Sequence, residues 1–238
     1  AASLRAIRDL DFDDIVDTQG LLRSALIARV ARGRRHGYDS SSIREPLASA
    51  FYNERYRVSR DLHAVERNRT LSGLALGYSP QGSPDFGLDR TRFSRMGSRY
   101  GLLLHATARR EKLWPEEHWI AFGKRLAGNI QLRLPWGTDL ERARAERIAA
   151  AVSGARVEEH KPLDQIVALI AGAQFVVGVD TGLLHLAAAL GVPSVAIFTG
   201  SEPGLTGPVG SGPLAILGTN GAPPAVDAVI DAVEKVAR

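Results

Sequence analysis

The chain has 238 residues, of which 45% are hydrophobic and 24% are charged, a balance typical of a globular protein with one large domain or two small ones. It contains no cysteine, which excludes disulfides, zinc–thiolate sites and thiol catalysis. No apolar run approaches the roughly 18 residues that a membrane-spanning helix needs.

Positive charge is concentrated in the first half of the chain. Residues 23–69 hold 11 arginines against 5 acidic residues, whereas residues 101–238 hold 13 basic and 14 acidic ones. One interpretation is a solvated basic face, and the other is a surface for a polyanion such as nucleic acid, an anionic lipid or a phosphorylated substrate. Because the sequence has no RNA-binding aromatic motif and no zinc finger, we expect no nucleic-acid partner.

The first hundred residues predict one strand followed by helices. The strand is residues 13–20, DDIVDTQG, which run into a turn. Three stretches predict helices: residues 21–32, 44–53 and 63–77. Gly77 ends the last of these as a C-terminal cap.

A linker is predicted after the last of these helices. Residues 78–99 are rich in Pro, Gly and Ser and have no clear period. We therefore expect a first domain over residues 1–77 and a second over residues 100–238.

Strands and helices alternate regularly from residue 100 onward. The predicted strands are residues 100–107, 129–137, 155–160, 174–180, 193–198 and 212–218. The predicted helices are residues 114–128, with Pro115 in the first turn, 138–152, 162–173, 182–191 and 223–238. This alternation predicts a parallel sheet with helices on both faces, a Rossmann-like α/β domain that binds ligands at the carboxyl ends of its strands.

Asp180-Thr181-Gly182 spells the triplet of the aspartic proteases, but its context does not fit that class. Those enzymes are mostly β-structure and use two such triplets, and the other similar stretch, residues 17–20, is interrupted. Here the triplet joins a buried strand to a helix. Such a turn directs free N–H groups and the positive end of a helix dipole at one point, which favours a phosphate. The alternative is that Asp180 only caps the helix.

A second strand end carries groups that suit a diphosphate. His105 and Thr107 follow the strand that begins at Tyr100, and a basic loop containing Lys112 comes next. Glu141 opens the helix after LPWG, where an acid either bonds ribose hydroxyls or favours the helix dipole.

Three motifs carry a resemblance to a known family. HATARREKLWPEEHW, LPWG and VGVDTGLLHLAAALGVPSVAIFTGSEPGL resemble the bacterial lipopolysaccharide heptosyltransferases of glycosyltransferase family 9. REPLASAFYN and HAVERNR in the first half are also similar, so the resemblance covers nearly the whole chain. The HAT and WPEEHW segments favour the heptosyltransferase I group over the II group.

The resemblance implies a fold and an activity. The family has the GT-B fold, with two Rossmann-like domains facing a cleft. It transfers L-glycero-D-manno-heptose from ADP-heptose to a Kdo sugar of Kdo2-lipid A, with inversion and without a metal or other cofactor. The enzyme would be cytoplasmic and peripheral at the inner membrane.

The resemblance also implies site residues. The matched donor-binding positions are Thr107, Lys112, Glu141, Lys161, Asp180, Thr181, Gly182, Leu183 and His185. Glu141 would hold the ribose, Lys161 would lie near the adenine, and the others would line the diphosphate and heptose. Lys112 is also the predicted catalytic residue, because the departing ADP gains negative charge. Ala108 departs from the family, which often has a second threonine there.

The family's catalytic base has no counterpart in this chain. The family opens with a strand and a GD loop that supplies an aspartate, and Asp17 lies at a strand end without matching that motif. We expect either omitted segments or a fragment, with an incomplete N-terminal domain. No metal site is expected, because DFDD at residues 11–14 is interpreted as a solvated turn.

Arginines of the first half are the predicted acceptor site. Arg44, Arg67 and Arg69 offer planar forks that match carboxylates and phosphates, and Glu66 cannot neutralise both Arg67 and Arg69. The alternative is an exposed helix face. Two alternative functions stay open: another family member such as heptosyltransferase II or III, and a non-catalytic ADP-sugar-binding module.

Overall fold

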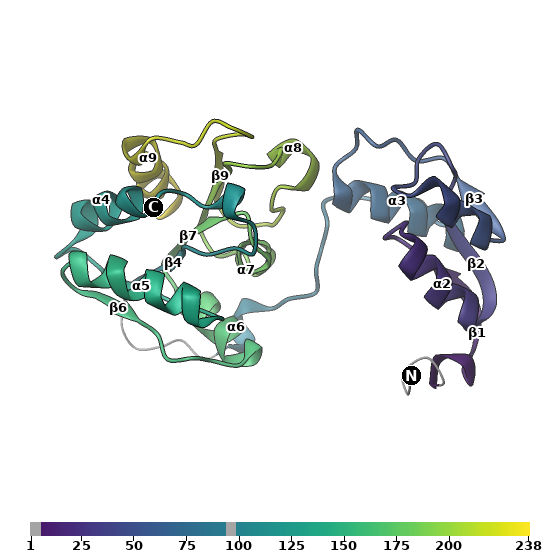
Figure 1. Cartoon of the computed structure of the whole chain (residues 1–238), viewed down its shortest axis with the longest axis horizontal. Helices are drawn as coiled ribbons and strands as arrows, with labels where there is room; N and C mark the ends of the chain where they lie inside the picture. The colour runs from purple at the N-terminus through teal and green to yellow at the C-terminus, as the bar shows by residue number, and fades with distance from the viewer. Residues whose placement is uncertain (1–5, 94–98) are drawn as a thin grey trace. The chain divides into compact units, whose positions relative to one another are not determined.

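The computed structural model describes residues 6–93 and 99–238, and the chain divides into two compact units, residues 1–83 and 84–238. The boundary falls inside the predicted linker, residues 78–99, of which 94–98 lie outside the described residues. Both units are α/β (Figure 1).

The first unit is a three-stranded parallel sheet with helices packed on it. Its strands, in the spatial order β1-β2-β3, are β1 (Asp11–Val16), β2 (Arg32–Tyr38) and β3 (Glu54–Tyr56). Its helices are α2 (Leu22–Val30), the 3-10 helix η1 (Pro46–Phe51) and α3 (Ala64–Leu76). Buried side chains of α2, β2 and α3, among them Ala25, Tyr38 and Leu71, form its core.

The predictions for this unit were only partly correct. The sequence predicted one strand over residues 13–20, which overlaps β1 in part, and interpreted DFDD at 11–14 as a solvated turn, whereas these four residues begin β1. It did not predict β2 or β3. Of the predicted helix over residues 44–53, only Pro46–Phe51 is helical, as a 3-10 helix in place of an α-helix. The α3 prediction is confirmed, because the helix ends at Gly77 in the left-handed conformation, with φ of 74°.

The second unit is a six-stranded parallel sheet in the order β6-β5-β4-β7-β8-β9. Its strands are β4 (Tyr100–Leu104), β5 (Gln131–Leu134), β6 (Ala155–Val157), β7 (Phe175–Val179), β8 (Ser194–Ile197) and β9 (Leu214–Leu217). Its main helices are α4 (Glu116–Leu126), α5 (Asp139–Ala151), α6 (Leu163–Gly172), α7 (Gly182–Ala189) and α9 (Val226–Val236). The strands run outward from β4 to β6 and then from β7 to β9, so the strand order reverses between β4 and β7. Because of this reversal, the carboxyl ends of the central strands β4 and β7 are the expected ligand site of a Rossmann-like sheet.

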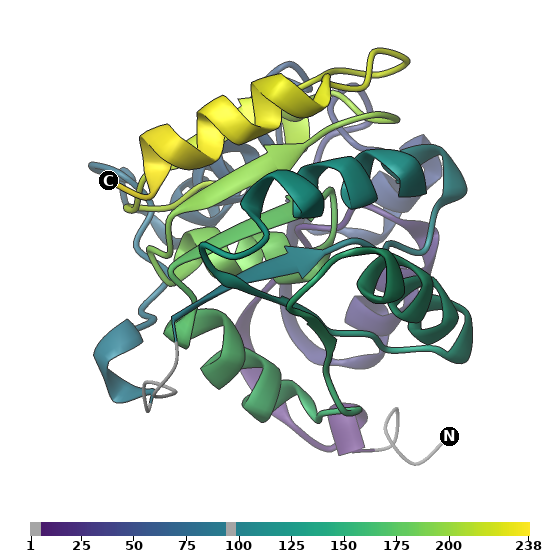
Figure 2. The same cartoon turned by 90° about the vertical axis from the view of Figure 1, so that its left-hand side faces the viewer.

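Helices cover both faces of this sheet, as predicted. Alternate strand residues point to opposite faces, so Leu103 and Val177 pack with α4, α5 and α9, whereas Leu102 and Val176 pack with α6 and α7. Figure 2 shows α9, in yellow, running alongside the strands.

Three short helices of this unit were not predicted: η2 (Arg90–Arg92), η3 (Arg110–Lys112) and α8 (Pro203–Thr206). Pro115 precedes α4 as its N-terminal cap residue and does not lie in its first turn. No helix in the described part of the chain is long and apolar enough to cross a bilayer.

Candidate donor-binding site

The ends of β4 and β7 meet at the point where the strand order reverses. Thr107 follows β4, and its Oγ1 donates a hydrogen bond to the backbone carbonyl of Asp180, which follows β7, at 3.1 Å. The two predicted loops are therefore joined directly, at the edge where such a sheet binds ligands.

Asp180 is the centre of a polar cluster. Its Oδ2 lies 2.5 Å from Lys112 Nζ and accepts a hydrogen bond from Ser201 Oγ at 2.7 Å. Its Oδ1 lies 3.6 Å from His185 Nε2. His185, Lys112 and Ser201 together hold the pKa of Asp180 well below its ordinary value, although burial opposes them.

The interpretation of Asp180 as a helix cap is wrong. Thr181 occupies the N-cap position of α7 and makes no side-chain hydrogen bond to the helix. The Asp180 carboxylate is used to fix Lys112 beside the start of α7.

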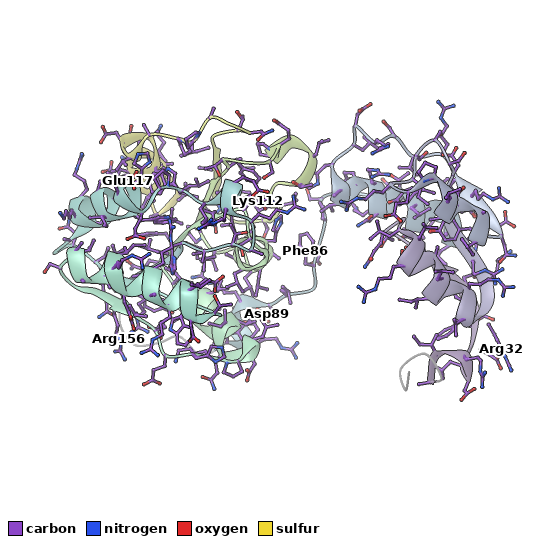
Figure 3. The ribbon with its side chains drawn as sticks, viewed as in Figure 1. Arg32, Phe86, Asp89, Lys112, Glu117 and Arg156 are labelled. Carbon is purple, nitrogen blue, oxygen red and sulfur yellow. The ribbon has the colours of Figure 1, made fainter. Side chains whose placement is uncertain are left out.

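A loop that the sequence analysis did not single out holds Lys112 in place. Thr199 Oγ1 donates to the carbonyl of Glu111 at 2.8 Å, and a Cβ at Gly200 would lie 2.6 Å from the same carbonyl oxygen. The loop after β8 therefore supports η3, which carries Lys112 (labelled in Figure 3). The sequence feature that could have identified this loop is Thr199-Gly200-Ser201, which directly follows the predicted strand over residues 193–198.

The start of α7 faces open space. A Cβ at Gly182 would meet no atom within 4 Å, and Gly182 is exposed. A ligand can therefore approach the first amides of α7 closely, next to the Lys112–Asp180 pair.

A pocket of about 290 Å³ extends from this point along the carboxyl edge of the sheet. Its lining includes five of the predicted donor residues: Thr107, Glu141, Lys161, Thr181 and Leu183. The other predicted residues, Lys112, Asp180, Gly182 and His185, belong to the Asp180 cluster or to α7. Ala108 also lines the pocket.

Glu141 is already hydrogen-bonded within its own helix end. Its Oε2 accepts from the backbone N–H groups of Gly137 at 2.8 Å and Thr138 at 3.1 Å, while Thr138 Oγ1 accepts from the Glu141 N–H. This reciprocal arrangement is a capping box. Glu141 thus has the helix-terminal role that we weighed, and it also lies on the pocket wall.

The far end of the pocket is aromatic. Trp136 and His160 have ring centroids 5.1 Å apart, and both line the pocket together with Lys161. Neither aromatic ring was singled out from the sequence, although Trp136 is part of the LPWG motif.

His105 lines the pocket as a buried, neutral group. Burial, assisted by the Arg144 charge, lowers its pKa to about 4. It therefore adds no positive charge for a phosphate at neutral pH.

In the first unit, two of the three predicted acceptor arginines make internal contacts. Arg67 Nη2 donates to the carbonyl of Ser42 at 2.7 Å, and its guanidinium lies over the Tyr38 ring. Arg69 pairs with Glu66 at 3.0 Å and also donates to two backbone carbonyls. Arg44 is exposed and, within the described residues, has no hydrogen bond or ion pair.

Asp17 holds the turn after β1. Its carboxylate accepts from the N–H of Gln19 at 2.9 Å and from the hydroxyls of Ser24 and Tyr52, each at 2.7 Å. This buried carboxylate is used by the fold to hold the turn. Across residues 6–93 and 99–238, no group of three acidic or histidine side chains is arranged to hold a metal ion.

Comparison with known proteins supplies a family. A family model described as glycosyltransferase family 9 (heptosyltransferase) matches residues 1–231. Lipopolysaccharide heptosyltransferase 1 of Escherichia coli O18:K1:H7 is 42% identical over 211 residues, which are 86% of this chain and 65% of that protein. The chain thus spans slightly less than two thirds of that relative's length.

Two solved structures are similar over nearly the whole chain. The structure of E. coli heptosyltransferase WaaC with ADP matches with a TM-score of 0.88 and 37% identity, covering 98% of this chain and 77% of that one. The structure of WaaC with ADP-2-deoxy-2-fluoro heptose matches with a TM-score of 0.85 and 37% identity, covering 98% and 75%.

Proposed function

This chain belongs to glycosyltransferase family 9, and from that premise we propose that it transfers heptose from ADP-heptose to a Kdo sugar of Kdo2-lipid A, with inversion. The observation that carries the proposal is the Asp180 cluster at the start of α7, because it places an ammonium and free helix amides beside a pocket at the switch point of the sheet. The similarity to the WaaC structures with ADP and an ADP-heptose analogue supports the choice of donor.

The donor would lie along the pocket with its diphosphate at α7. Thr181, Gly182 and Leu183 would offer hydroxyl and amide groups to the phosphates, and Lys112 would balance the charge that develops on the departing ADP. Thr107 and His185 flank this point. Glu141 would hold the ribose and Lys161 would lie near the adenine.

Asp180 would act by orienting Lys112. A lysine held at one side by a carboxylate still has N–H groups for a phosphate, because an ammonium carries three donors. The ion pair therefore presets the position of the ammonium before the donor arrives, which lowers the reorganisation that charge stabilisation requires.

The acceptor would bind to the first unit, and the enzyme would work at the cytoplasmic face of the inner membrane. Kdo carboxylates and lipid A phosphates present several negative charges, and arginine matches such groups bidentately. Of the three predicted arginines, Arg44 is the most available, because Arg67 and Arg69 already make internal contacts.

The test is a transfer assay with the purified protein. ADP-heptose is incubated with Kdo2-lipid A, and both ADP release and the heptosylated lipid are measured. Transfer to Kdo2-lipid A supports the proposal. Transfer only to an acceptor that already carries a heptose would indicate the heptosyltransferase II reaction, and ADP binding without any transfer would indicate a binding module.

A further inference from the structure

A buried carboxylate lies behind the aromatic end of the pocket. Glu158 follows β6 and is 5% exposed. Its Oε1 lies 3.5 Å from Arg133 Nη1, and its Oε2 lies 3.6 Å from Lys161 Nζ. Glu158 is not among the residues that line this pocket, although it lines a neighbouring hollow together with Trp136 and His160. Its influence on a ligand in the first pocket would therefore act through the neighbours that it contacts.

Arg133 anchors this carboxylate from within the sheet. It lies on β5, its side chain is 10% exposed, and its guanidinium lies over the Tyr100 ring at 4.4 Å. An arginine that is fixed by a strand and an aromatic ring is a rigid partner. The position of the Glu158 carboxylate is therefore determined by the core.

Glu158 contacts two residues that do line the pocket. Its carboxylate holds the Lys161 ammonium, and its backbone carbonyl accepts a hydrogen bond from Trp136 Nε1 at 2.7 Å. One buried residue thus fixes both a cation and an aromatic ring on the same wall.

The place of this wall identifies the part of the ligand that it meets. The phosphate-binding groups lie at the other end, where Lys112 and the start of α7 follow β4 and β7. The wall formed by Trp136, His160 and Lys161 follows β5 and β6, farther along the strand order. An aromatic surface with one directed cation suits a planar heterocycle that carries hydrogen-bond acceptors.

We propose that Glu158 is a positioning residue that sets affinity for the nucleobase of a nucleoside diphosphate donor by fixing Lys161 and Trp136. The proposal rests on the proposed function, since it deepens the description of the same pocket. It assigns a binding role to a residue that does not touch the ligand.

The test compares a ligand that has a nucleobase with one that has none. Binding of ADP and of inorganic pyrophosphate to the full chain is measured by calorimetry or competition. Glu158→Gln keeps the shape of the side chain but removes its charge, and we expect about fivefold weaker ADP binding with pyrophosphate affinity unchanged. Glu158→Asp, which keeps the charge, should restore part of the affinity. Glu159→Gln, a matched change at the exposed neighbour, should bind ADP like the wild type.

A double-mutant cycle tests the route through Lys161. Lys161→Met should weaken ADP binding by a similar factor, and Glu158→Gln combined with Lys161→Met should lose little more than either alone. If Glu158→Gln fails to fold, Lys161→Met carries the comparison of ADP with pyrophosphate, because it leaves the Arg133–Glu158 pair intact.

The outcomes separate this inference from the proposed function. ADP affinity equal to wild type in Glu158→Gln would overturn the inference alone, as would a loss of pyrophosphate affinity as large as that of ADP. A wild-type protein that binds no ADP would overturn the proposed function and this inference with it.

Discussion

Replacing Lys112 by alanine separates the catalytic role of its ammonium from a structural one. Lys112 and Asp180 form a close ion pair whose side chains are 19% and 8% exposed. Removing one partner of a buried pair typically costs about 3–5 kcal/mol, because the other charge is left uncompensated. Asp180 keeps Ser201 and His185 as partners, so we expect the free energy of unfolding to fall by only about 1–2 kcal/mol.

The decrease in kcat of Lys112→Ala should be larger than the loss of folding stability can explain. The ammonium counters charge that appears on the diphosphate only as the sugar leaves, so its loss should lower kcat by more than about tenfold, or over about 1.4 kcal/mol of transition-state stabilisation. The assay is the initial rate of ADP release at saturating donor and acceptor, with thermal unfolding followed in parallel. Lys124→Ala on α4, where the lysine is exposed, is the matched control and should behave like the wild type.

Either of two results would refute the reasoning. A Lys112→Ala protein that is less stable but has wild-type kcat would mean that Lys112 serves only to pair with Asp180. A loss of kcat that disappears at a temperature where the variant is fully folded would lead to the same conclusion.

Three further predictions follow from the charges of the two units. Turnover should be unchanged by EDTA, and a strict requirement for Mg²⁺ in a rate assay would contradict the helix-terminus mechanism. Because the pKa of Asp180 is lowered from 3.8, its pairing stabilises the fold fully above that value and is lost as the pH falls through the lower folded value. In urea unfolding, the free energy of unfolding of Asp180→Asn should therefore fall less than that of the wild type as the pH is lowered below about 4. An equal dependence of the unfolding free energy on pH in the two proteins would contradict this. Arg44→Ala should raise the acceptor KM without lowering stability, whereas Arg67→Ala should lower stability as well, because Arg67 packs on Tyr38. The wild-type acceptor KM should rise with ionic strength, since exposed charges are screened over roughly 8 Å. If neither salt nor Arg44→Ala changed the acceptor KM, the basic first half of the chain would have another role.

The second unit could be predicted almost entirely from the sequence. Its central strands are buried on both faces and therefore appear as continuous apolar runs, such as YGLLL and FVVGV. Its helices carry clear start signals, such as Thr138 with Glu141 before α5. Because both signals are local, the order of strands and helices followed directly.

The first unit could not be predicted as well, because its signals are not local. The β2 sequence RGRRHGY has neither an apolar run nor an apolar alternation. It is a strand because it pairs through its backbone with β1 on one side and β3 on the other and buries His36, Gly37 and Tyr38, and its Arg34 and His36 side chains contact Asp14 of β1. Such pairs join residues about twenty positions apart and become visible only when the strands lie side by side. The apolar spacing of residues 44–53 predicted an α-helix, but only the six residues Pro46–Phe51 are helical, and they form a 3-10 helix.

The donor-site residues illustrate the same limit at a finer scale. Thr107, Glu141 and Asp180 could be selected because each follows a strand or opens a helix, but the sequence could not show what each side chain contacts. Asp180 was weighed as a cap and instead binds Lys112, which comes from a different loop.

The Asp180–Lys112 pair and the Glu158–Lys161 pair use the same arrangement near the two ends of one pocket. In each, a carboxylate that is less than one tenth exposed holds a lysine that is only partly buried. A lysine has a long, mobile side chain, and ordering it costs conformational entropy of up to about 2 kcal/mol. Because each ion pair orders its lysine during folding, the ammonium is already in place when the ligand binds, and binding costs less conformational entropy. The two lysines differ in what they should change: Lys112 lies beside the phosphate end and should act mainly on kcat, whereas Lys161 lies at the aromatic end and should act mainly on donor affinity. This division of roles would be contradicted if Lys112→Ala changed the donor KM and left kcat unchanged. It would also be contradicted if Lys161→Met lowered kcat and left the donor KM unchanged.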